Sequence, residues 1–486
     1  MPFDQSIQLT EEQVKILAAL TGPANLQIQA LAGTGKSTTL KLIDHATEVE
    51  PILYLAFSKA VVEEVKADRK HNATEKEQRF TFSNTTEVRT FNSLGHSIWG
   101  HACAHKVTLD KDKTKNLFKT VIESWSKHRQ GEAWKRYWEV TQAVGLAKSL
   151  GYVPANCFPD ARRLIGEEFW DRLDEEPDEL TCAITDLILA ASIKSAYLGC
   201  IDFNDQVYMP ALFGGSFPRY PLVLVDEDQD LSPCNHAMLE KLGSSRIIAV
   251  GDDYQSIYVF RGAKQGGMHD QAVAFKMEQL PLSVSFRCPS EIVKNVHWRV
   301  PNFKWRTEGG YVGRLETHKP SGFKDGCAII CRNNAPLFRL AFQLLANGRS
   351  VNVAGSDIGP RLLNTLKRLG DESMSRTQVL GAIAEWQEDR EGKGSTTAKD
   401  LADAMRVFTN RADSLGSAIA YAEHLSAQKG TIKLMTGHKS KGLEFDTVYY
   451  LDPWLIHEDE QDLNLKYVIS TRARRELFEV DSVVIR

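Results

Sequence analysis

The sequence lacks the features of a membrane or secreted protein. None of the apolar runs in its 486 residues approaches the roughly 20 residues that a transmembrane helix needs. The first residues, MPFDQSIQLTEEQ, have neither the basic nor the apolar region of a signal peptide. We therefore expect a folded intracellular protein of the cytoplasm, with two to four domains and no membrane partner.

Cysteine is scarce and shows no pairing pattern. The eight cysteines are scattered, and the closest two, Cys327 and Cys331, lie in the apolar run CAIIC, which is typical of a buried strand. Alternation places both on one face, and no second Cys/His pair follows nearby, so the spacing favours core packing over a zinc site. A reducing compartment is expected.

An excess of positive charge is also missing. The chain has 59 lysines and arginines against 63 acidic residues, a formal net charge of −4. Composition therefore gives no global indication of nucleic-acid binding. Such a role requires local basic and aromatic grooves, because phosphate contacts need positively charged partners.

Short apolar, β-branched runs recur between helical stretches. Their continuous hydrophobicity is typical of strands covered on both faces, which indicates parallel α/β sheets. The runs form two clusters, one before about Ala263 and one after about Cys327, and this predicts two α/β cores. The clearest runs are Leu26–Leu31, Ile52–Phe57, Leu222–Val225, Arg246–Val250, Ala328–Cys331, Thr431–Met435 and Thr447–Leu451.

Two stretches with helical patterning interrupt these cores. The first, from Asp110 to Leu198, holds four tryptophans among charged residues, and the second, from Asp357 to Lys429, contains the loop-like EDREGKGSTTAKD. No internal repeat at a solenoid period is evident. The predicted domains are a first core in 1–109 and 199–285 with a helical insertion at 110–198, and a second core in 286–356 and 430–486 with a reduced helical insertion at 357–429.

A phosphate-binding loop is indicated by ALAGTGKS, which follows the apolar LQIQ and precedes the helical TTLKLIDHA. Its glycines let backbone N–H groups converge on phosphate oxygens at the positive end of a helix dipole. Lys36 can reach the β- and γ-phosphates, and Ser37 can ligate Mg²⁺. The alternative, an ordinary glycine turn beside a fortuitous lysine, is disfavoured by this context. The expected nucleotide contacts are Ala30, Leu31, Ala32, Gly33, Thr34, Gly35, Lys36, Ser37 and Thr38.

A pair of carboxylates ends the apolar run LVLVDE. Asp226 is placed to hold Mg²⁺, directly or through water, and Glu227 to orient and deprotonate the attacking water. Two acids at a strand end can also be a solvated loop. The presence of a P-loop in the same chain favours the catalytic interpretation.

The order of further motifs resembles superfamily 1 DNA helicases of the UvrD/Rep/PcrA type. VGDDYQSIYVFRGA (Val250–Ala263) is the most specific match, and VDEDQDLSP has Asp228 where alanine is commoner. The resemblance implies an α/β fold with two RecA-like parallel-sheet cores, a P-loop NTPase that uses ATP and Mg²⁺. It covers roughly Leu9–Ala102, Ile201–Val296, Gly326–Ala354 and Gly430–Val480.

The resemblance also implies roles in nucleotide binding. Gln13 of LTEEQ would read the adenine, Phe286 of SVSFRCP would stack on it, and Glu444 would lie near the ribose. Gln255 would contact the γ-phosphate and the attacking water. Two arginines of the second core, aimed at the P-loop of the first, suggest a composite site that closes with ATP and reopens on hydrolysis. The implied catalytic residues are Lys36, Glu227, Gln255, Arg287 and Arg472.

For DNA, the resemblance implies contacts from aromatic rings and from two polar motifs, TFNSLG and LMTGHKSKG. Stacking on an aromatic ring contributes roughly 1–3 kcal/mol per base. The loop that holds Gln255 would also hold two of these rings, so nucleotide sensor and DNA platform would share one segment. The implied DNA-contact residues are Phe57, Thr90, Asn92, Ser93, Tyr258, Phe260, Thr436 and His438.

Three functions remain to be weighed. The leading hypothesis is a DNA helicase, 3′→5′ by resemblance, acting on single-stranded and tailed duplex DNA with accessory replication or repair proteins. The second is a DNA-stimulated translocase or switch with little unaided unwinding, since only about 95 residues separate CRNNAP from LMTGHKSKG and no duplex-separating hairpin is recognisable. The third, a P-loop kinase or GTPase, has no use for the VGDDYQSIYVFRGA loop.

Overall fold

The chain, in a computed structural model, forms two compact α/β units. The structure describes residues 8–75, 79–155, 157–173, 176–243, 245–258, 262, 266–353, 363–392, 398–427 and 430–485. The first unit is Met1–Leu31 with Gly35–Leu282, and the second is Ala32–Thr34 with Ser283–Arg486. Each contains a six-stranded, all-parallel sheet, so the predicted fold class is confirmed.

The first unit alternates strands and helices along most of its length. Its strands are β1 (Leu26–Ala30), β2 (Ile52–Ala56), β3 (Glu87–Thr90), β4 (Thr108–Leu109), β5 (Cys200–Ile201), β6 (Leu222–Asp226), β7 (Arg246–Gly251) and β8 (Glu278–Leu282). Its α-helices are α1 (Glu11–Ala19), α2 (Lys36–Ala46), α3 (Lys59–Thr74), α4 (Phe91–Ala102), α5 (Lys113–Glu123), α6 (Lys127–Lys135), α7 (Tyr137–Leu150), α8 (Glu179–Tyr197), α9 (Asp205–Phe213), α10 (Pro233–Lys241) and α11 (Gly267–Ala274). Short 3₁₀ turns are η1 (Glu167–Arg172), η2 (Asp228–Asp230) and η3 (Asp253–Gln255).

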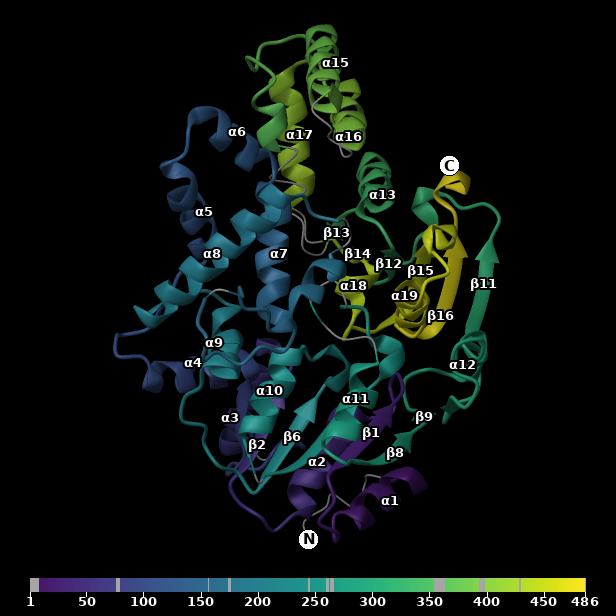
Figure 1. Ribbon diagram of the computed structural model, residues 1–486. Helices are drawn as coiled ribbons and strands as arrows, with labels where there is room; N and C mark the ends of the chain where they lie inside the picture. The colour runs from purple at the N-terminus through teal and green to yellow at the C-terminus, as the bar shows by residue number, and fades with distance from the viewer. Residues whose placement is uncertain are drawn as a thin grey trace. The chain divides into compact units, whose positions relative to one another are not determined.

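The first sheet has the order β3-β2-β6-β7-β1-β8 and is covered on both faces (Figure 1). Alternate residues of its central strands belong to different cores: Leu53 and Val223 pack with α4, α9 and α10, whereas Tyr54 and Leu224 pack with α1, α2 and α3. This two-sided burial explains the continuous apolar runs in the sequence.

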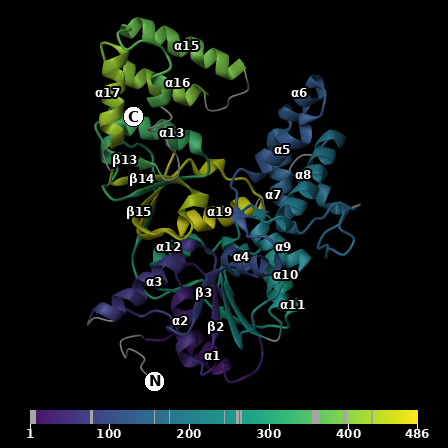
Figure 2. The same ribbon diagram turned by 90° about the vertical axis from the view of Figure 1, so that its left-hand side faces the viewer.

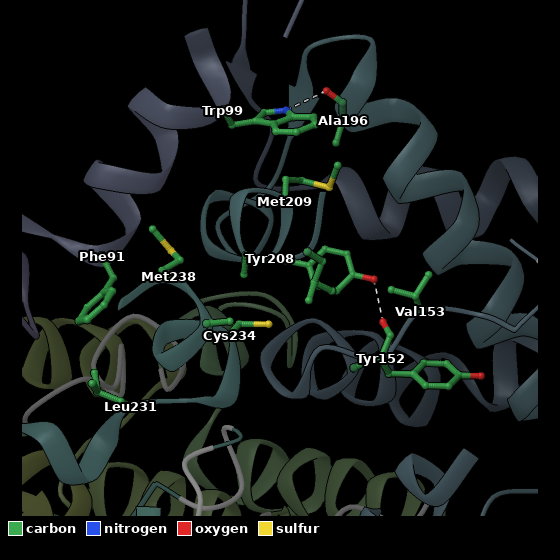
Figure 3. Close-up of a cluster of buried hydrophobic side chains, with 14 of the residues drawn as sticks. Phe91, Trp99, Tyr152, Val153, Ala196, Tyr208, Met209, Leu231, Cys234 and Met238 are labelled. Carbon is green, nitrogen blue, oxygen red and sulfur yellow. Dashed lines mark hydrogen bonds between the residues drawn. The ribbon is translucent and has the colours of Figure 1, made fainter. Parts of the chain in front are cut away.

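A helical subdomain, α5 to α8, lies between β4 and β5, and both views show its helices beside one another (Figures 1 and 2). Its core is continuous with one face of the sheet. Figure 3 shows how α9 is anchored there: the Tyr208 hydroxyl donates to the carbonyl of Tyr152 at 2.7 Å. In the same cluster, the Trp99 indole of α4 donates to the carbonyl of Ala196 at 3.1 Å.

Helix α8 is, among the described residues, the one helix long and apolar enough to cross a membrane by length and composition. The sequence inspection did not single it out, because Asp186 and Lys194 interrupt its apolar positions. Ile184, Ile188 and Ile193 are fully buried in the core of the first unit, as expected for the core helix of a globular domain.

The second unit repeats the α/β pattern. Its strands are β9 (Val284–Ser285), β10 (Lys304–Trp305), β11 (Tyr311–Leu315), β12 (Ala328–Cys331), β13 (Val351–Val353), β14 (Ile432–Thr436), β15 (Phe445–Leu451) and β16 (Ala473–Val480). Its helices are α12 (Ser290–Asn295), α13 (Asn334–Ala346), α15 (Arg376–Gly392), α16 (Ala398–Asn410), α17 (Leu415–Ala427), α18 (Gly437–Ser440) and α19 (Glu460–Ser470), with 3₁₀ turns η5 (Pro320–Gly322), η6 (Pro453–Leu455) and η7 (Ser482–Val484).

The second sheet has the order β11-β16-β15-β12-β14-β13. Cys327 and Cys331 are buried on the same side of it, with α13, and all eight cysteines are free thiols, so the prediction of core packing is confirmed. Helices α15, α16 and α17 group together, in green in both views, around a separate core that includes Met405 and Phe408 (Figures 1 and 2).

Five strands of the two large sheets, β3, β8, β11, β13 and β16, have no counterpart among the seven apolar runs of the sequence. β8 follows the first cluster of apolar runs but lies within the predicted first core, where it pairs with β1 through Glu278–Leu282. The strands β3, β8, β11 and β13 lie at sheet edges, and most of their residues are exposed or partly exposed, so they lack the continuous apolar signal of central strands. β16 lies inside the second sheet, but its sequence ARRELFEV mixes charged and apolar residues.

Candidate nucleotide-binding site

The P-loop lies between the end of β1 at Ala30 and the start of α2 at Lys36. Gly33 and Gly35 have φ values of 69° and 83°, a left-handed conformation that glycine adopts without strain. Gly35 is the N-cap of α2 and has no side chain that could occupy the first N–H groups of the helix. Those groups can therefore bind phosphate oxygens. Leu31, Ala32 and Thr34 are buried, whereas Ser37 is exposed and Thr38 partly exposed.

The catalytic carboxylate predicted from LVLVDE lies beside this loop. The sheet order places β6 two strands from β1, and parallel strands end at the same edge. There Lys36 Nζ is 3.9 Å from Glu227 Oε2. Glu227 has a φ of 52°, an uncommon conformation for a non-glycine residue that turns its side chain out of the strand path. Both side chains can thus face one bound phosphate group.

Asp226 is the last residue of β6 and is almost fully buried. Its Oδ2 accepts a hydrogen bond from the Tyr54 hydroxyl at 2.8 Å. Burial, together with the adjacent Glu227, raises the pKa of Asp226 to about 6. A cation bound beside this carboxyl would offset the free-energy cost of burying its negative charge.

The described residues contain no cluster of three or more His, Cys, Asp or Glu side chains suited to a metal ion. Mg²⁺ does not need one, because it usually takes one or two protein ligands together with water and substrate phosphates. Ser37 and Asp226 fit this donor set: they would hold Mg²⁺ jointly with ATP.

A chain of hydrogen bonds leads from Glu227 to the loop after β7. Gln229 Nε2 donates to Glu227 Oε2, and Gln229 Oε1 accepts from the backbone N–H of Asp252 at 2.8 Å. Asp252 Oδ2 then accepts from Gln255 Nε2 at 2.6 Å. Gln229, Asp252 and Gln255 are all buried. A Cβ at Gly251 would lie 2.6 Å from Gln229 Oε1, so the close approach of this strand requires glycine.

The same loop continues into an aromatic pair. Tyr258, three residues after Gln255, stacks with Phe57 at the end of β2, with ring centroids 6.1 Å apart and planes inclined by 18°. Phe57 is 41% exposed, which leaves ring surface for a ligand. Phe260 lies outside the described residues. Two of the three predicted stacking rings are thus brought together next to the predicted nucleotide sensor.

The TFNSLG motif forms the N-terminus of α4. Thr90 and Ser93 cap this helix reciprocally: the Thr90 hydroxyl accepts from the N–H of Ser93 at 3.1 Å, and the Ser93 hydroxyl from the N–H of Thr90 at 3.2 Å. The Asn92 amide donates to the carbonyl of Phe203 at 2.8 Å. All three side chains are at least partly exposed, and each already makes a structural hydrogen bond.

Two exposed aromatic residues beside the predicted motifs were missed. Phe203, next to Asn92, is 60% exposed, and Trp454, directly after β15, is 67% exposed. Single exposed apolar side chains are common on protein surfaces, so it is the hydrogen bond from Asn92 to the Phe203 carbonyl that connects Phe203 with a predicted DNA-contact residue. The available signal was an aromatic residue in a polar turn next to a short helix or strand end.

Gln13 occupies a position that differs from the expected one. It is buried, its Oε1 accepts from the N–H of Thr10 at 3.0 Å, and its Nε2 donates to Thr39 at 3.1 Å. The amide therefore completes the capping box of α1 and joins α1 to α2. Adenine recognition by Gln13 stays a prediction, for which its second N–H and the second lone pair of Oε1 would have to serve.

In the second unit, Arg287 and Glu444 meet although 157 residues separate them. Arg287 Nε donates to Glu444 Oε2 at 2.7 Å, and both side chains are partly exposed. Phe286 is 41% exposed, and the Arg306 guanidinium stacks 5.1 Å from its ring centroid. Arg287 and Glu444, predicted to contact the γ-phosphate and the ribose, thus contact each other. Phe286, predicted to stack on the adenine, has an exposed ring.

Arg472 is placed differently. It is 1% exposed, and its guanidinium donates to the carbonyls of Val468 and Leu443 at 2.9 and 3.2 Å and to the Thr471 hydroxyl at 3.1 Å. Here it joins the end of α19 to the loop before β15. The predicted finger role requires these bonds to be replaced and stays a prediction. Thr436 is the N-cap residue of the short helix α18, which contains His438.

Comparison with known families agrees with this arrangement. Residues 9–276 match the UvrD/REP helicase N-terminal domain, and residues 361–480 match the UvrD-like helicase C-terminal domain. The chain belongs to the UvrD/REP helicase family. The resemblance inferred from the motifs is confirmed.

Two named relatives are distant from this chain in sequence. F-box DNA helicase protein 1 of Schizosaccharomyces pombe is 23% identical over 538 residues, which cover 99% of this chain and 58% of that protein. DNA helicase IV of Escherichia coli is 25% identical over 285 residues, 51% of this chain and 40% of that protein. The chain thus spans about half the length of the curated relatives it matches. The crystal structure of Arterivirus nonstructural protein 10 (helicase) aligns with a TM-score of 0.37 and 11% identity, over 97% of this chain and 61% of that chain.

Proposed function

We propose that this chain is an ATP-driven DNA helicase that moves 3′→5′ along single-stranded DNA. The observation that carries the proposal is the continuous path from the phosphate site to the aromatic pair. Glu227, Gln229, Asp252 and Gln255 are linked by hydrogen bonds, and Tyr258 follows on the same loop. A change at the γ-phosphate can reach the stacking rings through one segment.

In this proposal each group of the first unit has one task. The P-loop N–H groups and Lys36 bind the phosphates of ATP, and Asp226 and Ser37 hold its Mg²⁺. Bound Mg²⁺ supplies charge neutralisation at the transferring phosphoryl group. Glu227 orients and deprotonates the attacking water, while Gln229 fixes its carboxylate. Gln255 distinguishes ATP from its products by its contact with the γ-phosphate.

The second unit supplies positive charge and a base platform in the proposal. Arg287 stabilises the charge that develops on the γ-phosphate, and it exchanges Glu444 for phosphate when ATP binds. Phe286 offers the ring face opposite Arg306 to the adenine. Arg472 acts as a second finger once it leaves its carbonyl partners.

The DNA surface of the first unit is formed by Phe57, Tyr258, Asn92 and Phe203. Stacked rings bind bases of any sequence, because every base has a π-face, and a translocating motor needs this tolerance. The names of the relatives, DNA helicases in a fungus and a bacterium, support DNA as the nucleic acid. Thr436 and His438 are proposed to contact the same strand from the second unit.

The test is strand displacement with ATP and Mg²⁺ on duplexes that have a 3′ or a 5′ single-stranded tail. The proposal predicts displacement from the 3′-tailed duplex alone. Displacement from the 5′-tailed duplex alone would contradict the polarity.

A second candidate is a DNA-stimulated translocase that removes proteins from DNA with little unaided unwinding. It is favoured by the small size of the insertion in the second unit, whose described part consists of α15, α16 and α17. This candidate predicts DNA-stimulated hydrolysis and displacement of a bound protein, with neither tailed duplex opened.

A further inference from the structure

Four charged side chains meet in the interior of the first unit, away from the phosphate site. Lys113 Nζ of α5 lies 2.6 Å from Asp205 Oδ2, and Lys148 Nζ of α7 lies 2.6 Å from Asp202 Oδ2 and 2.7 Å from Asp205 Oδ1. Lys113 and Lys148 also donate to the carbonyl and the hydroxyl of Ser192 in α8. We call Lys113, Lys148, Asp202 and Asp205 the ionic tetrad.

The ionic tetrad is electrically balanced, with two ammonium and two carboxylate groups, and three of its members are at most 1% exposed. Burying charge is costly unless the partners are close and well bonded. Burial disfavours the charge on both lysines. Asp205 and Asp202 overcome this at Lys148 and raise its pKa, whereas at Lys113 burial prevails and lowers the pKa. A packed apolar cluster would fill the same space without that cost, so the tetrad needs an explanation other than stability.

The two aspartates shape the turn between β5 and α9. Asp205 Oδ2 accepts from the N–H of Asp202 at 2.8 Å, and Asp202 Oδ1 accepts from the N–H of Asp205 at 2.9 Å. This reciprocal pair fixes the backbone of both residues between them. One is Phe203, whose ring is exposed and whose carbonyl accepts from Asn92.

The remainder of α9 has an independent anchor. Tyr208 and Met209 are buried in the apolar cluster of Figure 3, where Tyr208 donates to the carbonyl of Tyr152. Packing therefore holds the body of the helix, and the ionic tetrad holds the turn before it. The lysines of that tetrad come from α5 and α7 of the helical subdomain, and their ammonium groups bind Ser192, Asp202 and Asp205.

We propose that Lys113 and Lys148 are positioning residues through which the helical subdomain fixes the Phe203 turn for DNA binding. The inference rests on the proposed function, because it needs Phe203 to contact DNA. The inference goes beyond the proposed function because it gives the helical subdomain a task in the DNA site. Directional ionic bonds hold the Phe203 turn in one geometry, which apolar packing would specify less strictly.

The test uses a charge-balanced variant, Lys148→Met/Asp202→Asn. It removes one positive and one negative charge, leaves the Lys113–Asp205 pair, and keeps an oxygen at position 202 to accept from the N–H of Asp205. The matched control is Lys135→Met/Glu132→Gln, the same change at an exposed ion pair of α6. Each is made in the natural chain and in a Phe203→Ala background, and single-stranded DNA affinity is measured by fluorescence anisotropy.

Phe203→Ala alone should weaken DNA binding roughly fivefold or more, the loss of one stacking contact. The tetrad variant should weaken it about threefold or more in the natural background and not at all in the Phe203→Ala background. The α6 control should change neither. Hydrolysis without DNA should be unaffected by the tetrad variant, and hydrogen exchange should quicken at the amides of Asp202 and Asp205.

Equal losses in both backgrounds would overturn the inference, because they would show general destabilisation. A normal affinity in the tetrad variant with faster exchange at the turn would overturn it as well, and so would an unaffected affinity in Phe203→Ala. If the variant does not fold, Ser192→Ala, which removes one acceptor from Lys148, is subject to the same comparison. A natural chain that binds no single-stranded DNA would refute the proposed function itself, a distinct result.

Discussion

Replacement of Arg472 by alanine should lower stability as well as hydrolysis. In the interior the guanidinium donates to the carbonyls of Val468 and Leu443 and to the Thr471 hydroxyl. Hydrogen bonds that involve a charged group contribute about 1.5–3 kcal/mol each, and a buried acceptor left unpaired adds its desolvation cost. Because some of this is recovered by water or relaxation, we expect a net loss of about 3–5 kcal/mol. For a unit of this size that corresponds to a melting temperature lower by roughly 6–20 °C.

Arg287→Ala is the matched control. Its ion pair with Glu444 is partly exposed, and such pairs contribute about 0–1 kcal/mol, so the melting temperature should change by roughly 4 °C or less. Both variants should lose hydrolysis, since arginine fingers in related phosphoryl transfer contribute about 10³–10⁵ in rate.

The assay pairs calorimetric melting without nucleotide with single-turnover hydrolysis in the presence of DNA. An unchanged melting temperature in Arg472→Ala would show that the buried hydrogen bonds do not persist in solution. A rate loss of roughly tenfold or less at Arg287 would mean that it does not reach the γ-phosphate.

Three further predictions concern the first unit. Lys36→Ala should weaken ATP binding, because the lysine contacts the phosphates of bound ATP before reaction. Glu227→Gln should stop turnover with ATP still bound, because the glutamate acts on the attacking water. Equal ATP affinities of the two variants in a nucleotide titration would contradict these roles. Phe57→Ala should cost roughly 1–3 kcal/mol of single-strand affinity and leave the melting temperature unchanged, since the ring is exposed; a large fall in melting temperature would instead indicate core packing. Burial raises the pKa of Asp186 to about 6, so its ionisation removes stability as the pH rises from about 4 to 6. Asp186→Asn should therefore melt about 2 °C higher at pH 8 but not at pH 4, after discounting for partial exposure; equal shifts at both pH values would exclude this cause.

The central strands were predictable because a strand that is buried on both faces needs apolar residues at successive positions, which gives a continuous apolar run. All seven runs, from Leu26–Leu31 to Thr447–Leu451, contain strands of the two large sheets. Edge strands such as β3 and β8 were not predictable, since one side of each faces solvent and polar residues interrupt their apolar ones. β8 even contains Pro281, which an edge strand tolerates.

The phosphate site was inferred from the sequence because its chemistry is local, and it stays a prediction. Glycines, a lysine and a serine must follow one another on a strand–turn–helix unit, and Lys36 and Glu227 indeed meet at one sheet edge. Hydrogen-bond partners were not predictable, because they depend on side chains distant in sequence. The capping role of Gln13 and the buried bonds of Arg472 are of this kind.

The ionic tetrad shows the same limit. Lys113, Lys148, Asp202 and Asp205 are ordinary charged residues of helical or turn segments, and nothing in their spacing separates them from surface charges. Only the packing of α5 and α7 against α9 and the turn before it brings each ammonium group within 2.7 Å of a carboxylate oxygen. Phe203 was likewise hidden in a short polar turn.

The most direct test of the account is the steady-state ATPase rate of the chain with and without single-stranded DNA, at saturating ATP and Mg²⁺. The path from Glu227 through Gln255 to Tyr258 predicts strong stimulation by DNA, which Tyr258→Ala reduces even at saturating DNA. A rate that is the same with and without DNA would contradict the account.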